Sequence, residues 1–267
     1  MLSGWPARWR AWRERRAIER RAIPDDLWLE TLRGWPFLAR RPLDDLLRLR
    51  EMSALFLDRK EFSASGGLVL TDAMAVAVAA QACVPVLHMP GGVALYDGFV
   101  GIVMQPAEVV VPRQWHDEDG VVHHGEEVLA GEAIEGGPVM LSWHDVRLAG
   151  EPDGMDGGYN VVIHEFAHVL DMRDGPADGM PPLPDRAWRT RWAQVMQGAL
   201  RQHADEVDRG DPTWLDPYAA QGPEEFFPVA TEAFFVAPDG LDAEFPEVYA
   251  LLRDYFAQDP LRHHPRG

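Results

Sequence analysis

Two histidines and a glutamate lie close together in one apolar segment of this sequence. The segment runs from Asn160 to Asp171, with His164 and His168 four residues apart and Glu165 between them. In a helix, residues four apart lie on the same face, one turn from each other. Two imidazoles placed in this way can hold one zinc ion, and the glutamate is placed to act on a water molecule bound to it.

The surroundings of this motif favour a metal site over a chance match. In a chain with 10 histidines, the same spacing arises in roughly a few per cent of shuffled sequences. The flanking residues are almost all apolar, however, and Asn160 is a suitable N-cap. Because buried polar side chains need partners, two unpartnered histidines in such a helix would be costly. We therefore expect a metal ion rather than two solvent-facing histidines.

A catalytic zinc ion needs a third protein ligand and keeps one position open. Glu225 and Glu232 are seven residues apart and share one face of a helix predicted over residues 224–235. One of them could bind the metal while the other orients a histidine, although Pro228 would strain the helix between them. Asp171 is too near in sequence to turn back easily. It could accept a hydrogen bond from a ligand histidine or simply end the helix.

The rest of the chain supplies helices on both sides of a few short strands. Helices are expected in two segments between residues 24 and 60, from about residue 71 to 85, from residue 185 onward, over 224–235 and over 246–258. Short apolar runs between glycines and prolines predict strands over 93–96, 99–103, 109–111 and 138–143. Residues 115–127 form a polar stretch whose loop histidines, His116, His123 and His124, are further candidate ligands.

These patterns predict an α+β fold, mainly helical, with a small mixed β-sheet. The helices come first, the sheet follows, and the helical metal-binding half comes last. We expect a single domain over residues 24–267, preceded by a basic extension over residues 1–23. The seven arginines of that extension predict a solvated basic helix; the other interpretation is that it docks on an acidic surface of this protein.

Charge and composition exclude several classes of function. A net charge of −18 argues against a nucleic acid or an anionic membrane as partner. No apolar run reaches the length needed to cross a bilayer; the longest, residues 73–84, predicts a buried helix. Cys83 is the single cysteine, so an intramolecular disulfide framework is excluded and a reducing, cytoplasmic setting is favoured. We expect a buried, inert thiol there.

Several segments together resemble a known family. They are the motif at His164–Asp171 with the glycine-containing loop after it, Asp216–Ala220, Pro223–Phe227, Glu232–Phe235 and Gly137–Trp143. In these segments the chain resembles the Mlc titration factor A family of bacterial zinc peptidases of the gluzincin type. The resemblance covers most of residues 30–262. The second half is also similar to the catalytic domain of anthrax lethal factor.

The resemblance implies a role for each residue of the site. It places the zinc ligands at His164, His168 and Glu225 and the general base at Glu165. Tyr218 lies seven residues before Glu225 and matches a tyrosine that stabilises the oxyanion of the tetrahedral intermediate. The expected reaction is hydrolysis of a peptide bond by a zinc-activated water.

The family also has a histidine that caps the metal in a resting state, at the end of a Gly-x-Val-His segment. In this chain that histidine is His123, and His124 stands next to it. The resemblance implies a cytoplasmic, monomeric, zincin-like metallopeptidase, aminopeptidase-like on short peptides. It also implies binding to the repressor Mlc, which would modulate the glucose phosphotransferase system. The alternative is a regulatory binding protein whose zinc is largely structural and closed by His123. A zinc hydrolase acting on other bonds also fits the motif.

Overall fold

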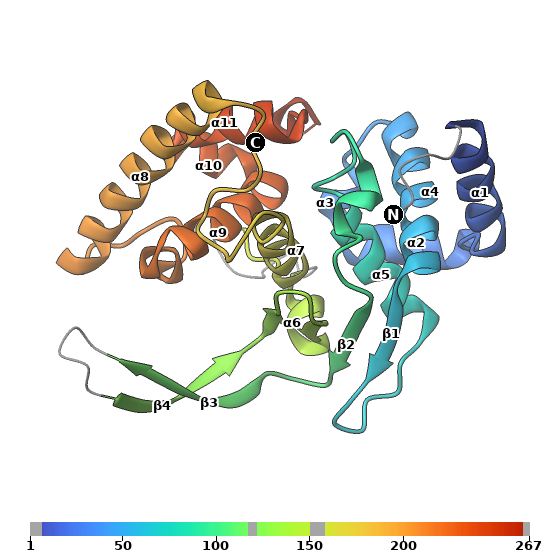
Figure 1. Ribbon diagram of the computed structural model, residues 1–267, viewed down its shortest axis with the longest axis horizontal. Helices are drawn as coiled ribbons and strands as arrows, with labels where there is room; N and C mark the ends of the chain where they lie inside the picture. The colour runs from blue at the N-terminus through green and yellow to red at the C-terminus, as the bar shows by residue number, and fades with distance from the viewer. Residues whose placement is uncertain (1–6, 117–121, 150–157, 264–267) are drawn as a thin grey trace.

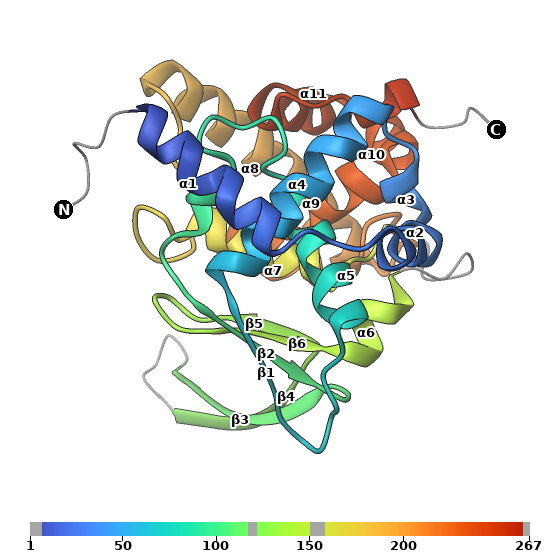
Figure 2. The ribbon, with the colours of Figure 1, turned by 90° about the vertical axis from the view of Figure 1, so that its right-hand side faces the viewer.

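The structure is a computed structural model that describes residues 7–116, 122–149 and 158–263. Helices gather on one side of a small mixed sheet, and a two-stranded hairpin extends from the sheet side (Figures 1 and 2). The predicted α+β class, mainly helical with a small mixed sheet, is confirmed. The N-terminal helices cover one side of the body, and the C-terminal helices cover the other (Figure 1).

The helices of the described part follow one another with short connections. Their bounds are α1 (Ala7–Arg20), α2 (Asp25–Gly34), α3 (Pro36–Ala39), α4 (Leu43–Arg59), α5 (Asp72–Cys83), α6 (Trp143–Leu148), α7 (Val161–Asp171), α8 (Arg186–Arg209), α9 (Pro223–Val236), α10 (Pro238–Glu244) and α11 (Pro246–Phe256), with 3₁₀ turns η1 (Gly92–Tyr96), η2 (Pro217–Gln221) and η3 (Pro260–His263). The helix carrying the His-Glu-His motif, α7, lies centrally in the body (Figure 1).

The main sheet has four short strands in the order β1-β2-β6-β5. They are β1 (Glu61–Ala64), β2 (Gly101–Gln105), β5 (Gly131–Ala133) and β6 (Val139–Ser142). The first three strands in this order are parallel, and β5 runs antiparallel to β6 at one edge. Alternate residues of β2, Ile102 and Met104, are fully buried, as a half-covered strand requires. The edge strand β5 lies beside α7.

One face of α7 is held by an aromatic cluster. The ring of Phe166 packs against Phe56, Tyr96 and Phe99, with ring centroids 4.8–5.9 Å apart. The only lysine of the chain, Lys60, is buried beside this cluster. Its Nζ donates to the carbonyl oxygens of Tyr96 and Phe99, both at 2.5 Å, and lies 3.6 Å from the centroid of the Phe99 ring. This cation therefore has its partners within the protein.

Two predicted segments differ from the structure. Residues 93–96, expected as a strand, form the 3₁₀ turn η1. The reason is that Gly91 and Gly92 adopt positive φ angles of 104° and 50° and turn the chain there. The stretch 115–127 was expected as a polar loop, but its described residues belong to β3 (Val109–His116) and β4 (Val122–Leu129), which pair antiparallel. Polar residues are tolerated because this hairpin stands apart from the main sheet.

The basic N-terminal segment is helical and docks on the chain's own surface. Helix α1 packs along α4 (Figure 1), with Arg20 3.1 Å from Asp58 and Glu14 3.2 Å from Arg59. Ala17 is buried at this contact. The described arginines of α1 are thus solvent-exposed for the most part, as expected of a solvated helix, but one side of α1 docks on α4 through these two ion pairs and Ala17. The proposed division of the chain at residue 23 stays a prediction.

Burial elsewhere agrees with the composition. Cys83, at the end of α5, is fully buried, and burial raises the pKa of its thiol. Within the described ranges, no helix combines the length and the apolar character that crossing a membrane requires.

Candidate metal centre

Helix α7 begins where its sequence provides a cap. The Asn160 side chain accepts a hydrogen bond from the Ile163 N–H at 2.9 Å, which satisfies one of the free donors of the first turn. The apolar residues of α7, such as Phe166, face the core. The turn spacing then leaves His164 and His168 together on the face toward α9, with ring centroids 4.9 Å apart.

Three ligand-type atoms converge between α7 and α9. The Nε2 atom of His164 lies 3.2 Å from Nε2 of His168 and 3.2 Å from Oε2 of Glu225. Nε2 of His168 lies 3.5 Å from the same Glu225 oxygen. Among the described residues, these three form the group of potential metal ligands whose donor atoms gather closely enough to share one ion.

The spacing of these atoms fits a tetrahedral metal ion. Zinc bound at about 2.0–2.1 Å from each ligand keeps neighbouring ligand atoms about 3.3 Å apart. The three observed separations lie around this value. In addition, Oε2 of Glu225 is buried and accepts no hydrogen bond from any described residue. A positive ion shared by these three atoms would satisfy that oxygen, and two imidazoles with one carboxylate are a donor set that zinc accepts.

The second glutamate of α9 has a different place. Oε1 of Glu232 lies 2.7 Å from Nδ1 of His164, on the side of the ring away from Nε2. The other carboxylate oxygen of Glu232 accepts from the backbone N–H of Asn160. A carboxylate bound to Nδ1 fixes the orientation of the ring and leaves Nε2 as the ligand atom. Of the two glutamates that the sequence left open, Glu225 thus reaches both Nε2 atoms and Glu232 reaches Nδ1.

This contact is the middle of a longer buried chain of hydrogen bonds. The Asn160 side-chain amide donates to Oε1 of Gln81 at 2.8 Å, and Gln81, on α5, is fully buried. Gln81 in turn donates to the Ala77 carbonyl. The chain runs from α5 through the N-cap of α7 to Glu232 and then to His164. Buried polar groups that are paired in this way favour a single geometry, because breaking any one hydrogen bond leaves a buried polar group without a partner.

Helix α9 brings both glutamates to α7 without a break. It starts with Pro223 in its first turn, where a missing N–H costs nothing. Pro228 lies inside the helix and removes one backbone hydrogen bond, yet the helix continues through it to Val236. The expected strain therefore does not interrupt the helix. The seven-residue spacing puts Glu225 and Glu232 on the face that packs against α7.

Glu165 is buried next to this cluster. It is 4% exposed, and its Oε2 atom has no hydrogen-bond partner among the described residues. Burial raises the pKa of Glu165, while the two neighbouring imidazoles and the nearby backbone N–H of Ala133 oppose the rise. Strand β5 lies directly against this side chain. A Cβ atom on Gly131 would be 2.5 Å from Oε1 of Glu165, so a larger residue there would displace the Glu165 side chain.

Neighbouring charges shift the pKa values of His164 and Glu225 in opposite directions. Burial disfavours a charge on His164, but Glu232 and Glu225 outweigh it, and the pKa of His164 lies above its usual value. Burial acts to raise the pKa of Glu225, but hydrogen bonds and charge interactions with His164 and His168 outweigh it and hold this pKa well below the usual range. The cluster is thus built around a positive charge, which a proton or a metal ion can supply.

Tyr218 is held at the edge of the site by η2. The side chain of Asp216 accepts from the Tyr218 N–H at 2.9 Å, and the Asp216 carbonyl accepts from Nε2 of the buried His203 at 3.1 Å. The Tyr218 ring centroid lies 6.1 Å from that of His164, and the ring is partly exposed. The tyrosine expected to stabilise an oxyanion is therefore a neighbour of the cluster.

Asp171 does not support a histidine. Its Oδ2 atom accepts from the backbone N–H groups of Asp178 and Gly179 at 3.0 and 2.8 Å. Gly179 has a φ angle of 76°, and a Cβ there would lie 2.2 Å from the Pro223 carbonyl oxygen. Asp171 thus ties the end of α7 to the loop that packs on the start of α9. Burial raises the pKa of Asp171 to about 6.

The remaining predicted residues can be placed only in part. His123 and His124 lie on β4, opposite Trp115 and Gln114, but their side chains lie outside the described part of the structure. The proposal that His123 caps the metal therefore stays a prediction. Sequence reasoning missed Gln81 and Gly131. The signal for Gln81 was its position as the one polar residue late in an otherwise Ala- and Val-rich helix.

Comparisons with known proteins identify relatives of this chain. Three proteins named Mlc titration factor A are similar to the chain: one from Pectobacterium atrosepticum (34% identical over 243 residues, 87% of this chain and 89% of the relative), one from Serratia proteamaculans (38% over 242 residues, 87% and 89%) and one from Yersinia pestis (36% over 238 residues, 88% and 85%). The family of glucose-regulated metallo-peptidases M90 matches residues 9–257. This match takes in α7, η2 and α9 with all the residues of the cluster. The chain therefore belongs to the M90 family of glucose-regulated metallo-peptidases.

Proposed function

We propose that this chain is a zinc-dependent peptidase with aminopeptidase-like activity on short peptides. The observation that carries the proposal is the convergence of His164, His168 and Glu225 at 3.2–3.5 Å. Beside them lies the buried Glu165 carboxylate, whose Oε2 atom has no hydrogen-bond partner among the described residues. Two imidazoles and one carboxylate leave a fourth tetrahedral position for water or substrate, which is the arrangement of catalytic rather than closed structural zinc sites.

The protein side chains divide the work of peptide hydrolysis. His164, His168 and Glu225 would hold a zinc ion, which would supply Lewis acidity and lower the pKa of a water molecule at the site. Glu165, whose pKa is raised by burial, takes a proton from the attacking water and returns it to the departing amine. Tyr218 donates a hydrogen bond to the developing oxyanion. Glu232 keeps the His164 ring in place throughout.

We propose further that the chain acts in gene regulation. Its relatives bear the name Mlc titration factor A, and the M90 family is described as glucose-regulated. Binding to the repressor Mlc would let the protein modulate the glucose phosphotransferase system. The proposed molecule is a cytoplasmic monomer with no nucleic-acid partner, in line with its net charge of −18. Its peptidase domain spans residues 24–267.

The experiment that tests the enzymatic proposal compares Glu165→Gln with the parent. Purified proteins are assayed for zinc content and for hydrolysis of aminoacyl p-nitroanilides and short peptides. We expect Glu165→Gln to keep stoichiometric zinc and to lose turnover by about 10²–10⁴-fold, the usual contribution of a general base. Glu247→Gln, the same change at an exposed position of α11, is the matched control and is expected to turn over normally. Hydrolysis by Glu165→Gln at the parent rate would rule out the assigned mechanism.

The regulatory alternative is tested through His123. If His123 caps the metal, His123→Ala should raise peptidase activity, as removal of an inhibitory ligand would. Zinc without activity in both the parent and His123→Ala would instead favour a binding protein with a structural metal. Co-purification with the Mlc repressor, measured on the same variants, shows whether binding depends on the state of the site.

A further inference from the structure

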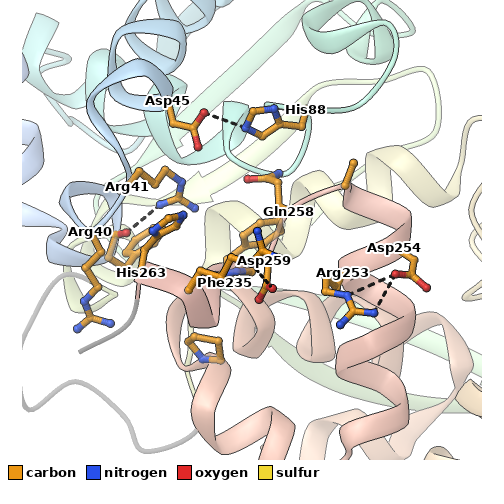
Figure 3. Close-up of a pocket in the computed structure, with 15 residues that line it drawn as sticks. Arg40, Arg41, Asp45, His88, Phe235, Arg253, Asp254, Gln258, Asp259 and His263 are labelled. Atoms are coloured by element: carbon orange, nitrogen blue, oxygen red, sulfur yellow. Dashed lines mark hydrogen bonds and ion pairs between the residues drawn. The ribbon is translucent and has the colours of Figure 1, made fainter. Parts of the chain in front are cut away.

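A polar cavity lies at the end of α9 opposite to the proposed ligand Glu225. It has a volume of about 460 Å³ and lies where the N-terminal helices meet the C-terminal ones (Figure 3). Its walls come from the α3–α4 connection, the loop after α5, the end of α9, and the α11–η3 segment. Phe235, in its wall, lies three residues beyond Glu232 on α9, but the cavity includes none of the proposed catalytic or metal-binding residues. Its size is that of a small-molecule site.

The charge of this cavity is opposite to that of the whole chain. Four arginines line it, against three aspartates, in a protein of net charge −18. Each aspartate already has a partner. Asp45 lies 2.9 Å from His88, and Asp254 lies 2.9 Å from Arg191. The third carboxylate is Asp259, which lies 3.0 Å from the Arg262 guanidinium and accepts from the Tyr249 hydroxyl at 2.7 Å. Two of the three carboxylates are therefore paired with arginines, and the third with the His88 ring.

Arg41 is the cation whose partners within the protein are incomplete. Its Nη1 donates to the Phe37 carbonyl at 2.8 Å, and its guanidinium lies 5.9 Å from the centroid of the Phe37 ring. Among the described residues it has no carboxylate within ion-pair distance, because the nearby Asp45 is bound to His88. Burial lowers the pKa of Arg41 to about 10, and Asp45 acts in the other direction. A guanidinium has five N–H donors, and among the described residues one acceptor, the Phe37 carbonyl, is recorded for Arg41.

The cavity lining also includes apolar side chains. Phe37, Phe235 and Pro238 contribute carbon surface, and the Gln258 amide is turned away to donate to the Val84 and Pro85 carbonyls. Figure 3 shows Arg41, Asp45 and His88 on one wall and Phe235 and Gln258 on the facing one. A ligand that suits this cavity has an anionic group for Arg41 and an organic body for the rings.

We propose that this cavity binds a small organic anion, with Arg41 gripping its phosphate or carboxylate group. Arginine suits either group because its planar fork donates two parallel hydrogen bonds to a pair of oxygens. A metal cation does not fit, since the paired aspartates have no free charge to offer. The cavity is also too small for a macromolecule to enter, so the partner is a metabolite-sized molecule.

The test measures the binding of three model compounds to the zinc-loaded protein by isothermal titration calorimetry. The compounds are phenyl phosphate, benzoate and the neutral benzyl alcohol. We expect at least one of the two anions to bind, benzyl alcohol to bind at least tenfold more weakly, and the affinity to fall as NaCl is raised. Binding of phenyl phosphate alone identifies a phosphate ester as the ligand class, and equal binding of benzoate extends it to carboxylates. If neither anion binds better than the alcohol, the proposal is wrong.

Matched variants locate the bound anion. Arg41→Gln is expected to weaken binding at least tenfold, and Arg41→Lys, which keeps the charge but lacks the fork, is expected to fall between Arg41→Gln and the parent. Arg209→Gln makes the same charge change on the exposed end of α8 and should bind like the parent. Glu225→Ala, which disrupts the proposed metal site, should also bind like the parent; this separates the cavity from an anion bound at zinc. Circular dichroism checks that each variant is folded. Parent-like binding by folded Arg41→Gln and Arg41→Lys would overturn the proposal.

Discussion

The two faces of α7 bury their polar groups in opposite ways. On the face toward α4 and η1, Phe166 sits in an aromatic cluster, and the nearby charge of Lys60 is met by two carbonyl oxygens and a ring. On the side of the metal cluster, Glu165 of α7 and Glu225 of α9 each keep a buried oxygen that accepts no hydrogen bond from the described residues. The first face is complete without a ligand, and the second is not.

We therefore expect one face of α7 to contribute mainly to stability and the other mainly to metal binding. A buried charge whose hydrogen bonds are all made, such as that of Lys60, contributes to one well-defined core. Buried carboxylate oxygens without hydrogen-bond partners instead favour the binding of a cation. Substitutions on the two faces should therefore differ in kind. Those toward α9 should change metal binding with little effect on the metal-free fold, and those toward α4 should do the reverse.

The largest effect is expected from Glu225→Ala, which removes a proposed ligand. We expect loss of stoichiometric zinc, measured by inductively coupled plasma mass spectrometry on the purified protein. The metal-free variant should unfold in urea within about 1 kcal/mol of the chelator-treated parent, because His164 keeps Glu232 as its partner when the Glu225 carboxylate is removed. If zinc is retained in full, Glu232 becomes the better candidate for the third ligand. Strong destabilisation of the metal-free Glu225→Ala protein would contradict the expectation that this side of α7 matters for metal binding and not for the metal-free fold.

On the aromatic face, Phe166→Ala should cost about 3–5 kcal/mol in the free energy of unfolding, as expected for a large side chain removed from a packed core. Zinc stoichiometry in the fraction that folds should stay at one, because the ligands lie on the other face. Urea denaturation and metal analysis on the same sample give both numbers. Phe166→Leu, which keeps most of the volume, is the graded control and should cost clearly less. A Phe166→Ala protein that is stable but metal-free would contradict this division of roles.

Glu232→Gln should have a smaller effect, confined to metal affinity. The amide can still accept from Nδ1 of His164 but brings no charge, and changes of this kind cost about 10–100-fold in metal affinity. Competition with a chromogenic chelator measures the affinity. Gln81→Leu removes the far end of the same hydrogen-bond chain and should weaken binding less than Glu232→Gln. Equal affinity in the parent and Glu232→Gln would show that Glu232 does not position His164.

The smallest effect concerns the pH dependence that Lys60 gives to stability. Burial lowers the pKa of Lys60 to about 8 in the folded protein, below its unfolded value of 10.5. Between these pH values the unfolded chain binds more protons, so the Lys60 contribution to stability rises with pH through this window. Between pH 7.5 and pH 10 we expect the free energy of unfolding of the parent to increase by roughly 1–3 kcal/mol relative to that of Lys60→Met. Urea unfolding of both proteins at the two pH values measures this difference. Parallel pH profiles for the two proteins would show that Lys60 is not desolvated.

Local patterns predicted the parts of this molecule that depend on nearby residues. The caps at Asn160 and Asp185 and the four-residue spacing of His164 and His168 specify α7, α8 and one face of the site. The same reasoning failed at residues 93–96, where two glycines with positive φ override an apolar run. It also had no means to find β1, whose four residues become a strand only by pairing with β2.

Long-range pairings decided what the sequence left open. Glu225 and Glu232 look equivalent along α9, and their roles diverge only because one meets Nε2 and the other Nδ1 of the same ring. Gln81 joins the site from 79 residues away. The basic cavity gathers Arg41 and Phe235 from opposite ends of the chain. No spacing rule connects such residues, since their proximity is a result of the tertiary packing.

The residues of the hydrogen-bond chain from Gln81 to His164 and of the metal cluster are synthesised at different times. A ribosome produces α5 first, α7 much later, and Glu225 and Glu232 near the end of the chain. The two histidines therefore emerge before either glutamate exists to complete the ligand set or to orient a ring. Because domains fold as units and a metal site does not preexist in the unfolded chain, we expect zinc to be captured only when α9 docks. Metal loading would then mark finished molecules, and a chain truncated before α9 would remain without metal.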